Sequence, residues 1–547
     1  MSTEVLVDVK LSSTHVPALD RSTGRARLIV DRSPFLVRGV ELHNSSSSSA
    51  AALQVGLESA RSVGANTVLA PVSWETVEPS EGSFELDHVT SLIESTRSAG
   101  LRLIILWFGA WKNGASTYAP AWVKRDWTRF TRCVLADGRL TDTLSPFTEE
   151  SLDATAFAML MRHVELIDGD HRTVLMVQVE NEVGLLGASR DHSCPANAAF
   201  TKPVPQSVVD ALAGRPTEAL GADITVWPEV LPSPDRSDEA FMAYGIASHI
   251  ERVADAGRQH SALPLFVNAW LDSDIDVDLP GFAVAGGQRP GIYPSGGPLP
   301  HVADIWQACA PSIDLLAPDL YFGDSRTIFG NFLAASKGLF IPEMRRDVTG
   351  VGQIFEAIGE FGALGVSPFG VDSGSAEDLQ ALTDAYDLLA RADPILSDTA
   401  HSGGQQRGFF LTDQQPQIDL VFSNVRMTAT RVTAIGTDPT GTCAYGIIRQ
   451  LGSDEFAAIG RGFKIAFAAI DGESNVGMES VQEIAGVAEA GSGRLLNGDE
   501  TAGGTSWIHP HGEPMSTAFF PIPMGHAHSG ISICRIYSYP RMSPQLV

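Results

Sequence analysis

The sequence predicts an α/β chain in which a (β/α)8 barrel, a TIM barrel, is followed by a C-terminal β-sandwich domain. From about residue 28 to 393, short runs rich in Val, Ile and Leu alternate with amphipathic segments, which is the pattern of parallel strands covered by helices. Eight such apolar runs occur in this region. After about residue 395 the helical periodicity fades, and β-rich runs separated by Gly, Asp and Asn follow.

The barrel prediction depends on the order of its elements. The predicted strands span residues 35–43, 67–72, 101–108, 173–180, 264–269, 313–320, 338–342 and 366–371. The clearest helices between and after them span residues 51–63, 87–99, 150–167, 238–256, 353–364 and 378–392. Eight strands with seven crossovers and a closing helix fit a closed barrel, although an open doubly wound sheet gives similar spacing.

Three further segments complete the predicted organisation. The serine run at 45–49 ends a strand and precedes an amphipathic segment, so it predicts a helix N-cap. The Pro-rich stretch at about 185–235 follows the fourth strand and predicts a long loop beside the substrate entrance. The predicted domains are an N-terminal extension (1–27), a barrel (28–394) and a β-sandwich-like domain (395–547). The β-rich runs of that last domain lie at 407–413, 418–434, 443–450, 463–472, 516–523 and 528–539.

Composition narrows the class of function. A chain of 547 residues predicts two or three domains. Its formal net charge of -27 disfavours nucleic acid and anionic membrane surfaces as partners and leaves neutral substrates. The five cysteines lie far apart without a CxxC pair, so neither a zinc knuckle nor a disulfide framework is indicated.

The N-terminus MSTEVLVDVK lacks the basic start and long apolar core of a secretory signal. This predicts a cytoplasmic protein, or a periplasmic or secreted one if a signal peptide was removed. No apolar run is long enough to cross a bilayer. The sequence leaves a homo-oligomer open.

Two predicted strands end in carboxylates. The fourth, VLMVQVENEVG, runs into Glu180, Asn181 and Glu182, and the seventh, GLFIPEMRRD, ends in Glu343. Barrel enzymes carry their catalytic groups at the C-terminal ends of the strands. Retaining glycoside hydrolysis requires two carboxyl groups about 5 to 5.5 Å apart, whereas the inverting reaction requires about 6.5 to 9.5 Å. We expect Glu182 and Glu343 to be separated by the shorter distance.

The run QVENEVG at 178–184 resembles the acid/base motif of glycoside hydrolase family 35, the β-galactosidases. Two upstream segments, LIVDRSPFLVRGVELHNSSSS and VLAPVSWETVEPSEGSFEL, are similar to the first two strands of a bacterial branch of that family. The likeness covers about residues 28–373, and the C-terminal region is similar to the β-rich appendage of the same branch.

This resemblance implies a retaining β-galactosidase without a cofactor or a catalytic metal. It implies Glu182 as the acid/base, Glu343 as the nucleophile and Asn181 as the group that hydrogen-bonds the sugar 2-hydroxyl. Substrates of the bacterial branch are galactose side chains of plant wall polysaccharides, notably xyloglucan oligosaccharides. The chain departs from many relatives at Pro71 and in the turn after the third strand, where Trp111, Lys112, Asn113 and Gly114 replace an acidic sugar-binding motif.

The other candidate substrate-binding residues close predicted strands or carry aromatic faces that stack on sugars. Tyr321 closes the sixth strand, where its hydroxyl could donate to Glu343 and hold it ionised. Trp107 is expected in the core and Glu180 in the barrel wall. The remaining candidates are Glu41, His43, Asn44, Trp74, Trp111, Asn113, Asn268 and Trp270.

Two other functions stay open at this point. One is a glycosidase of the same clan with another sugar preference, such as a β-glucosidase, β-mannosidase or β-glucuronidase. The other is a carbohydrate-binding protein that has lost catalysis.

Overall fold

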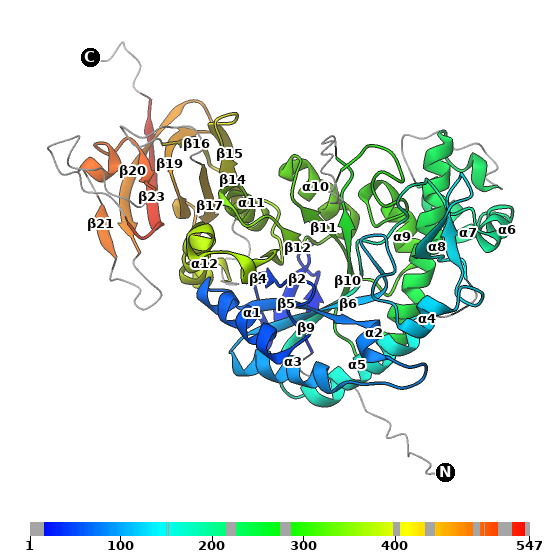
Figure 1. Cartoon of the computed structure of the whole chain (residues 1–547). Coiled ribbons are helices and arrows are strands. Elements are labelled where there is room, and N and C mark those ends of the chain that lie inside the picture. The colour runs from blue at the N-terminus through cyan, green and yellow to red at the C-terminus, as the bar shows by residue number, and fades with distance from the viewer. Residues whose placement is uncertain are drawn as a thin grey trace. The chain divides into compact units, whose positions relative to one another are not determined.

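The chain divides into two compact units in the computed structural model. The first consists of Met1–Met344 with Leu364–Ser373, and the second of Arg345–Ala363 with Gly374–Val547 (Figure 1). The structure describes residues 16–148, 150, 152–214, 226–273, 286–397, 405–432, 443–484, 493–496, 498–511 and 528–541.

Eight parallel strands form a closed barrel in the first unit, which confirms the predicted fold. They pair in the order β10-β11-β12-β13-β4-β5-β6-β9, and each predicted strand has an observed counterpart. Their bounds are β4 (Val37–Glu41), β5 (Thr67–Ser73), β6 (Arg102–Lys112), β9 (Val174–Asn181), β10 (Leu265–Trp270), β11 (Leu315–Leu320), β12 (Ile341–Met344) and β13 (Gly365–Pro368).

The helices of the first unit follow the strands in the chain, as predicted. They are α1 (Ala50–Ser62), α2 (Trp74–Val77), α3 (Asp87–Ser98), α4 (Ala121–Arg125), α5 (Ala154–Asp168), α6 (Cys194–Phe200), α7 (Gln206–Ala213), α8 (Pro234–Arg258), α9 (Ala303–Cys309) and α10 (Ser325–Ser336), with short 3-10 turns η1 (Trp227–Glu229), η2 (Pro300–Val302) and η3 (Val371–Ser373). At the start of α1 the Ser49 hydroxyl accepts from the Ala52 amide at 3.2 Å, so the serine run does supply an N-cap.

Apolar side chains from the strands fill the barrel interior, among them Leu106, Phe108 and Phe266. An antiparallel sheet of β1 (Ala18–Asp20), β2 (Arg27–Val30) and β3 (Ser33–Pro34) adds Leu28 and Val30 to the same core. The Ala26 amide bonds the Lys337 carbonyl just before β12, so this sheet lies at the N-terminal ends of the barrel strands. Residues 1–15 of the predicted N-terminal extension lie outside the described residues.

The segment predicted as a long loop at 185–235 contains α6, α7 and η1, and its residues 215–225 lie outside the described part. These short helices were not predicted, and neither was a hairpin of β7 (Arg132–Val134) and β8 (Leu140–Leu144). These helices and strands are too short for their sequences to show helical or strand periodicity. No helix in the described residues is both long and apolar enough to span a membrane.

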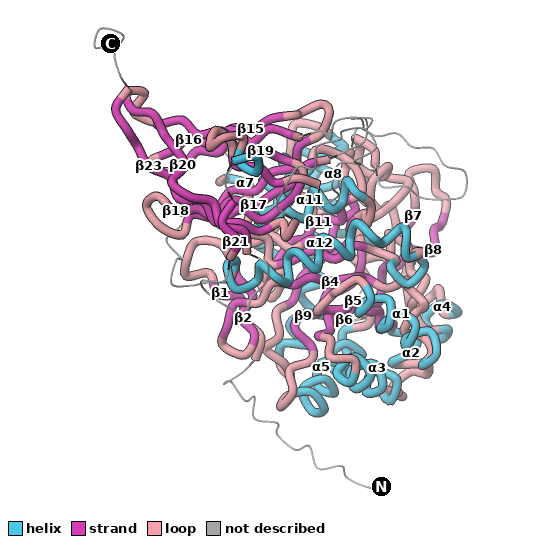
Figure 2. The backbone as a smooth tube through the Cα atoms, turned by 90° about the vertical axis from the view of Figure 1, so that its left-hand side faces the viewer, coloured by secondary structure: helices cyan, strands magenta, loops and turns pink. Residues whose placement is uncertain are grey.

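The second unit holds α11 (Val348–Gly359), α12 (Ala376–Leu396) and a β-rich region, whose strands are drawn in magenta in Figure 2. Two antiparallel sheets, of order β14-β17-β18-β23-β20-β21 and β15-β16-β19-β22, share one apolar core. This is the predicted sandwich, although the predicted run at 516–523 lies outside the described residues. The strands are β14 (Gln406–Leu411), β15 (Gln417–Val421), β16 (Val425–Arg431), β17 (Ala444–Gln450), β18 (Glu455–Arg461), β19 (Phe463–Ala469), β20 (Ser474–Glu483), β21 (Arg494–Leu496), β22 (Trp507–His509) and β23 (Ile531–Pro540), with a 3-10 turn η4 (Gly498–Thr501).

Candidate active site

Three carboxyl groups meet at the C-terminal ends of β9, β11 and β12. Each of Glu182, Asp319 and Glu343 has an oxygen within 4.8 Å of an oxygen of the other two. Glu182 and Glu343 are 5% and 9% exposed, so both are largely shielded from water. A close approach of this kind agrees with the shorter separation expected for the pair.

The backbone at the end of β9 determines how Glu182 reaches this cluster. Glu180 and Glu182 have φ values of 62° and 44°, in a left-handed region that non-glycine residues rarely adopt and that is frequent at functional sites. The Glu180 carboxylate turns into the barrel wall and accepts from the Ala110 and Trp111 amides at 3.0 and 2.7 Å. The irregular backbone therefore breaks the side-chain alternation and lets the adjacent Asn181 and Glu182 both face the site.

Glu343 accepts a hydrogen bond from the residue that follows β11. The Tyr321 hydroxyl donates to its Oε1 at 2.5 Å, as expected from the sequence. Burial and the neighbouring Glu343 charge raise the pKa of Tyr321, so the phenol keeps its proton and remains a donor. The second carboxylate oxygen, Oε2, is buried and has no hydrogen-bond partner among the described residues.

The surroundings of Glu182 favour its neutral form. Burial first, and then the charge of Glu343, raise its pKa from 4.5 to about 8. The ammonium of Lys112 and a hydrogen bond with Asp319 act in the opposite direction. Two carboxyl groups that are close together and shielded from water cannot both ionise readily, so one keeps its proton.

Asn268 and Asp319 link the end of β9 to the neighbouring strands. The Asn268 Oδ1 accepts from the Glu182 amide at 2.9 Å, and its Nδ2 donates to Asp319 Oδ2 at 2.7 Å. Asn268 was expected to bind a sugar, but both ends of its amide are engaged in fixing other site residues. Asp319 was missed, but Leu315 and Ala317 line the barrel interior, and a period of two places Asp319 and Tyr321 on that same face.

Glu41 and Lys112 complete the set of charged groups. Glu41 closes β4 and is 1% exposed, and burial together with Glu343 raises its pKa well above 4.5. Lys112 closes β6, where its Nζ donates to Asn181 Oδ1 at 2.9 Å. From the sequence, this lysine stood out only as a departure from the family pattern.

Several buried polar atoms around these carboxyl groups have no hydrogen-bond partner among the described residues. Buried polar groups are rarely left without one, so their gathering at one place marks where a polar ligand would bind. These atoms are Glu41 Oε1, Asn113 Oδ1, Asn181 Nδ2, Trp270 Nε1, Asp319 Oδ1 and Glu343 Oε2.

Two predicted residues lie on the loop that follows β4. The His43 ring contacts Phe369 edge-on and lies 2.8 Å from the Ser373 hydroxyl, while its backbone amide donates to Asp372. Asp372 was not predicted. Asn44 is exposed in the next turn.

The structure corrects the assignments of Trp74 and Trp111. Trp74 is fully buried, packs edge-on against Trp122 and donates to Glu78 at 2.8 Å. Trp111 packs against His249 of α8, and its Nε1 donates to the Leu144 carbonyl. Neither indole has a free face for a sugar, because both are packed within the protein.

A second buried polar cluster lies between the barrel strands β6 and β9 and the helices α5 and α8. Asp153, Glu180 and His249 each have a polar atom within 4.8 Å of the other two. Trp107, expected in the core, donates to Asp153 at 2.6 Å. Since both oxygens of Asp153 and of Glu180 already accept hydrogen bonds, we assign this cluster to the structure of the wall.

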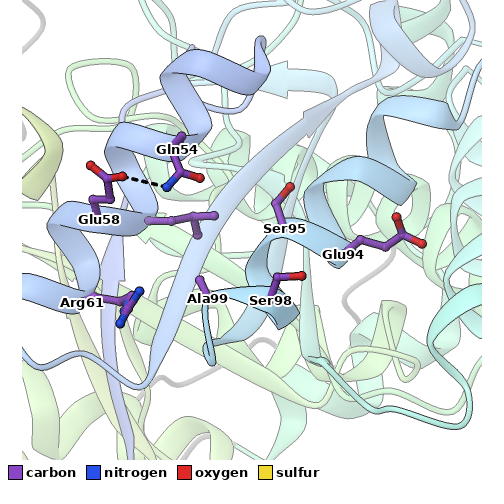
Figure 3. A pocket seen from close by; sticks show the side chains of 8 residues that line it. Gln54, Glu58, Arg61, Glu94, Ser95, Ser98 and Ala99 are labelled. Carbon is purple, nitrogen blue, oxygen red and sulfur yellow. Dashed lines mark hydrogen bonds between the residues drawn. The ribbon is translucent and has the colours of Figure 1, made fainter.

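A surface groove lies between α1 and α3, lined by Gln54, Glu58, Arg61, Glu94 and Ser95 among others (Figure 3). Gln54 donates to Glu58 at 2.7 Å across one turn of α1. None of the predicted site residues lines this groove.

One sequence family matches part of the chain. It is described as a domain of unknown function (DUF5597) and matches residues 382–507. No protein with a curated description matches the sequence.

Solved structures of glycoside hydrolases resemble the chain at low identity. They include the β-galactosidase of the psychrophilic Marinomonas ef1 (14% identity, TM-score 0.45, 66% of this chain and 61% of that one). The β-galactosidase of Bacillus circulans sp. alkalophilus matches with 13% identity, a TM-score of 0.44, and 66% and 57% coverage. The catalytic domain of a β-amylase from Paenibacillus polymyxa matches with 13% identity, a TM-score of 0.46, and 63% and 96% coverage.

The chain thus spans 61% and 57% of the length of these two β-galactosidases.

Proposed function

We propose that this chain is a retaining β-glycosidase that acts on β-galactosides, with Glu182 as the acid/base and Glu343 as the nucleophile. The observation that carries the proposal is the closeness of these two carboxyl groups, within 4.8 Å, at the ends of the fourth and seventh barrel strands. Their different environments support the division of roles. Burial and the Glu343 charge raise the pKa of Glu182 to about 8, whereas Glu343 accepts a hydrogen bond from Tyr321.

In this reaction Glu343 attacks the anomeric carbon while Glu182 protonates the departing glycosidic oxygen. The bond from the anomeric carbon to that oxygen breaks, and a glycosyl ester forms on Glu343. Glu182, now ionised, takes a proton from water as the water attacks the ester and releases the sugar. The unpartnered atoms of Asn181, Trp270 and Asp319 supply donors and acceptors for the sugar hydroxyls.

The choice of galactose rests on the sequence likeness to family 35. That likeness also suggests oligosaccharides from plant walls, such as xyloglucan fragments, as substrates. Glucose, mannose and glucuronic acid are the alternatives, because the catalytic pair does not read the groups on the sugar ring that distinguish them from galactose. A binding protein without catalysis is disfavoured by the retention of both glutamates.

A panel of chromogenic β-glycosides tests the proposal. We expect fastest hydrolysis of the galactoside, and proton NMR of the first-formed sugar should show the β anomer. Initial release of the α anomer would rule out the double displacement and this pairing. Sugar binding without hydrolysis of any glycoside in the panel would favour the binding protein.

A further inference from the structure

Lys112 places a positive charge beside the buried carboxyl groups of the candidate site. It is the last residue of β6 and pairs in register with Asn181 of β9. Its Nζ lies 2.9 Å from Asn181 Oδ1 and 4.9 Å from the centroid of the Phe108 ring. The side chain thus crosses from its own strand to the residue that precedes the acid/base.

This contact determines which way the Asn181 amide faces. A side-chain amide has an acceptor end and a donor end, whereas an ammonium group has only donors. Asn181 must therefore present its oxygen to Lys112, and its Nδ2 must point away from it. Asn181 is 1% exposed, and its Nδ2 has no hydrogen-bond partner among the described residues.

We propose that Lys112 is a positioning residue that locks the Asn181 amide with its NH2 group toward the sugar hydroxyl beside the anomeric carbon. The inference rests on the proposed function, because that carbon must lie between Glu182 and Glu343. The sequence likeness to family 35 gives Asn181 the hydroxyl on the adjacent carbon, C2, and the proposal takes this role over. Hydrogen bonds to this hydroxyl strengthen in the transition state of glycoside hydrolysis, so the correct amide orientation contributes to rate.

The same ammonium acts on the carboxyl cluster through its charge. Glu182 is faced by Glu343 from β12 and Asp319 from β11, with Glu41 on β4 nearby. The Glu343 charge raises the pKa of Glu182, whereas the Lys112 ammonium and a hydrogen bond with Asp319 lower it. Loss of this positive charge raises the pKa of Glu182 further. Activity that requires a protonated Glu182 would then persist to higher pH.

Lys112→Met is the informative variant, because methionine keeps an apolar stem beside Phe108 and loses both the charge and the donor. Lys112→Arg keeps both. Lys124→Met is the matched control, since Lys124 lies on α4 in an exposed ion pair with Glu75. Lys112→Gln provides a second neutral variant if the methionine variant does not fold, which thermal unfolding reports.

The experiment compares kcat/KM for the best aryl β-glycoside and for its 2-deoxy analogue in each variant. The difference in intrinsic reactivity between the two substrates is common to all variants and cancels. In the wild type we expect the 2-hydroxyl to raise kcat/KM by about a hundredfold or more. Lys112→Met should reduce this ratio about tenfold, mostly through kcat, while Lys112→Arg and Lys124→Met should stay within about threefold of the wild type.

The outcomes separate the inference from the proposed function. A wild type that hydrolyses no β-glycoside overturns both. An active wild type in which Lys112→Met slows both substrates equally overturns the positioning role alone, because a merely structural defect does not distinguish the two substrates. An alkaline limb of the pH profile that moves upward in Lys112→Met and not in Lys112→Arg supports the charge effect, and an unmoved limb contradicts it.

Discussion

Glu182 combines burial with a nearby like charge, and both favour its neutral form. Its pKa of about 8 lies far above the usual 4.5 because desolvation acts first and the Glu343 carboxylate acts second. A general acid works best when its pKa lies near the operating pH. In the proposed reaction, the residue that gives up a proton in the first step is thus the one whose surroundings favour the protonated form.

The first prediction concerns this ionisation. Since only protonated Glu182 can assist the leaving group, kcat/KM for a substrate with a poor leaving group should fall as the pH rises through about 8. A pH profile of initial rates measures the limb. An alkaline limb near the usual glutamate value of 4.5 would show that Glu182 ionises like an exposed carboxyl.

The second prediction separates the two glutamates by role. Glu182→Ala should slow substrates with poor leaving groups far more than activated aryl glycosides, and added azide should restore turnover as the β-glycosyl azide. Glu343→Ala should abolish the first step for every substrate, and any azide rescue should give the α-azide. The opposite pattern would exchange the two roles.

The third prediction addresses the Tyr321 phenol, which donates to the proposed nucleophile Glu343. Tyr321→Phe removes the 2.5 Å hydrogen bond to Glu343 and should lower kcat by about 10 to 100-fold, because such a hydrogen bond to a charged group is worth about 1.5 to 3 kcal/mol. Steady-state kinetics with an activated aryl glycoside measures the change. Tyr244→Phe on α8, beside Trp227, is the control and should keep the wild-type rate.

At the scale of the elements, the sequence was most informative where strands are regular. All eight barrel strands could be predicted, because buried parallel strands appear as continuous apolar runs. Glu343 and Tyr321 follow such runs directly, so their places at the rim were predictable. The same logic would have identified Asp319, two residues before Tyr321, through the alternation along β11.

The strand ends where the backbone is irregular were less predictable. The pairing of β6 with β9 shifts register between Trp107 and Lys112, and Glu180 has a positive φ. That shift decides whether the Trp111 or the Lys112 side chain faces the site. The residue types along the strand do not predict such a shift. Trp74 was misassigned because an apolar aromatic residue at a strand end suits either packing or sugar binding.

The fourth prediction tests how tightly this wall is packed. A Cβ atom at Gly109 of β6 would lie 2.1 Å from Asp153 Oδ2, 2.4 Å from Trp107 Nε1 and 2.5 Å from Glu180 Oε1. Gly109→Ala should therefore break buried hydrogen bonds and lower the free energy of unfolding by about 2 to 4 kcal/mol. Urea unfolding measures this.

Gly214→Ala is the control for that prediction. Its Cβ would meet only the Ala211 carbonyl oxygen at 3.5 Å, which is ordinary contact, so the change should stay within about 0.5 kcal/mol. If Gly109→Ala were equally mild, the wall would have to be looser than these distances indicate.

At the scale of the whole molecule, the buried carboxyl groups link function to stability. Glu41, Glu182 and Asp319 all have raised pKa values, with burial as the first cause. A group whose pKa is raised by folding binds protons more tightly in the folded chain than in the unfolded one. Its favourable contribution is complete below the unfolded value and is lost as the pH rises through the folded value.

The fifth prediction follows for Glu182, whose window runs from 4.5 to about 8. Glu182→Gln stays neutral at every pH and keeps nearly the same shape, so it avoids the cost of a buried charge. At pH 9 it should exceed the wild type in free energy of unfolding by a few kcal/mol, because each tenfold difference in proton affinity corresponds to about 1.4 kcal/mol. At pH 4 the difference should be small, since Glu182 is then protonated in both states of the wild type.

Urea unfolding of both proteins at the two pH values measures this difference, with Glu94→Gln as the control because Glu94 is exposed on α3. That control should change stability by less than about 0.5 kcal/mol at either pH. A gain in Glu182→Gln that is equal at both pH values would mean that the glutamine stabilises by packing. A gain confined to high pH, together with lost activity on poor leaving groups, would show that the chain gives up stability to keep an ionisable acid in its barrel.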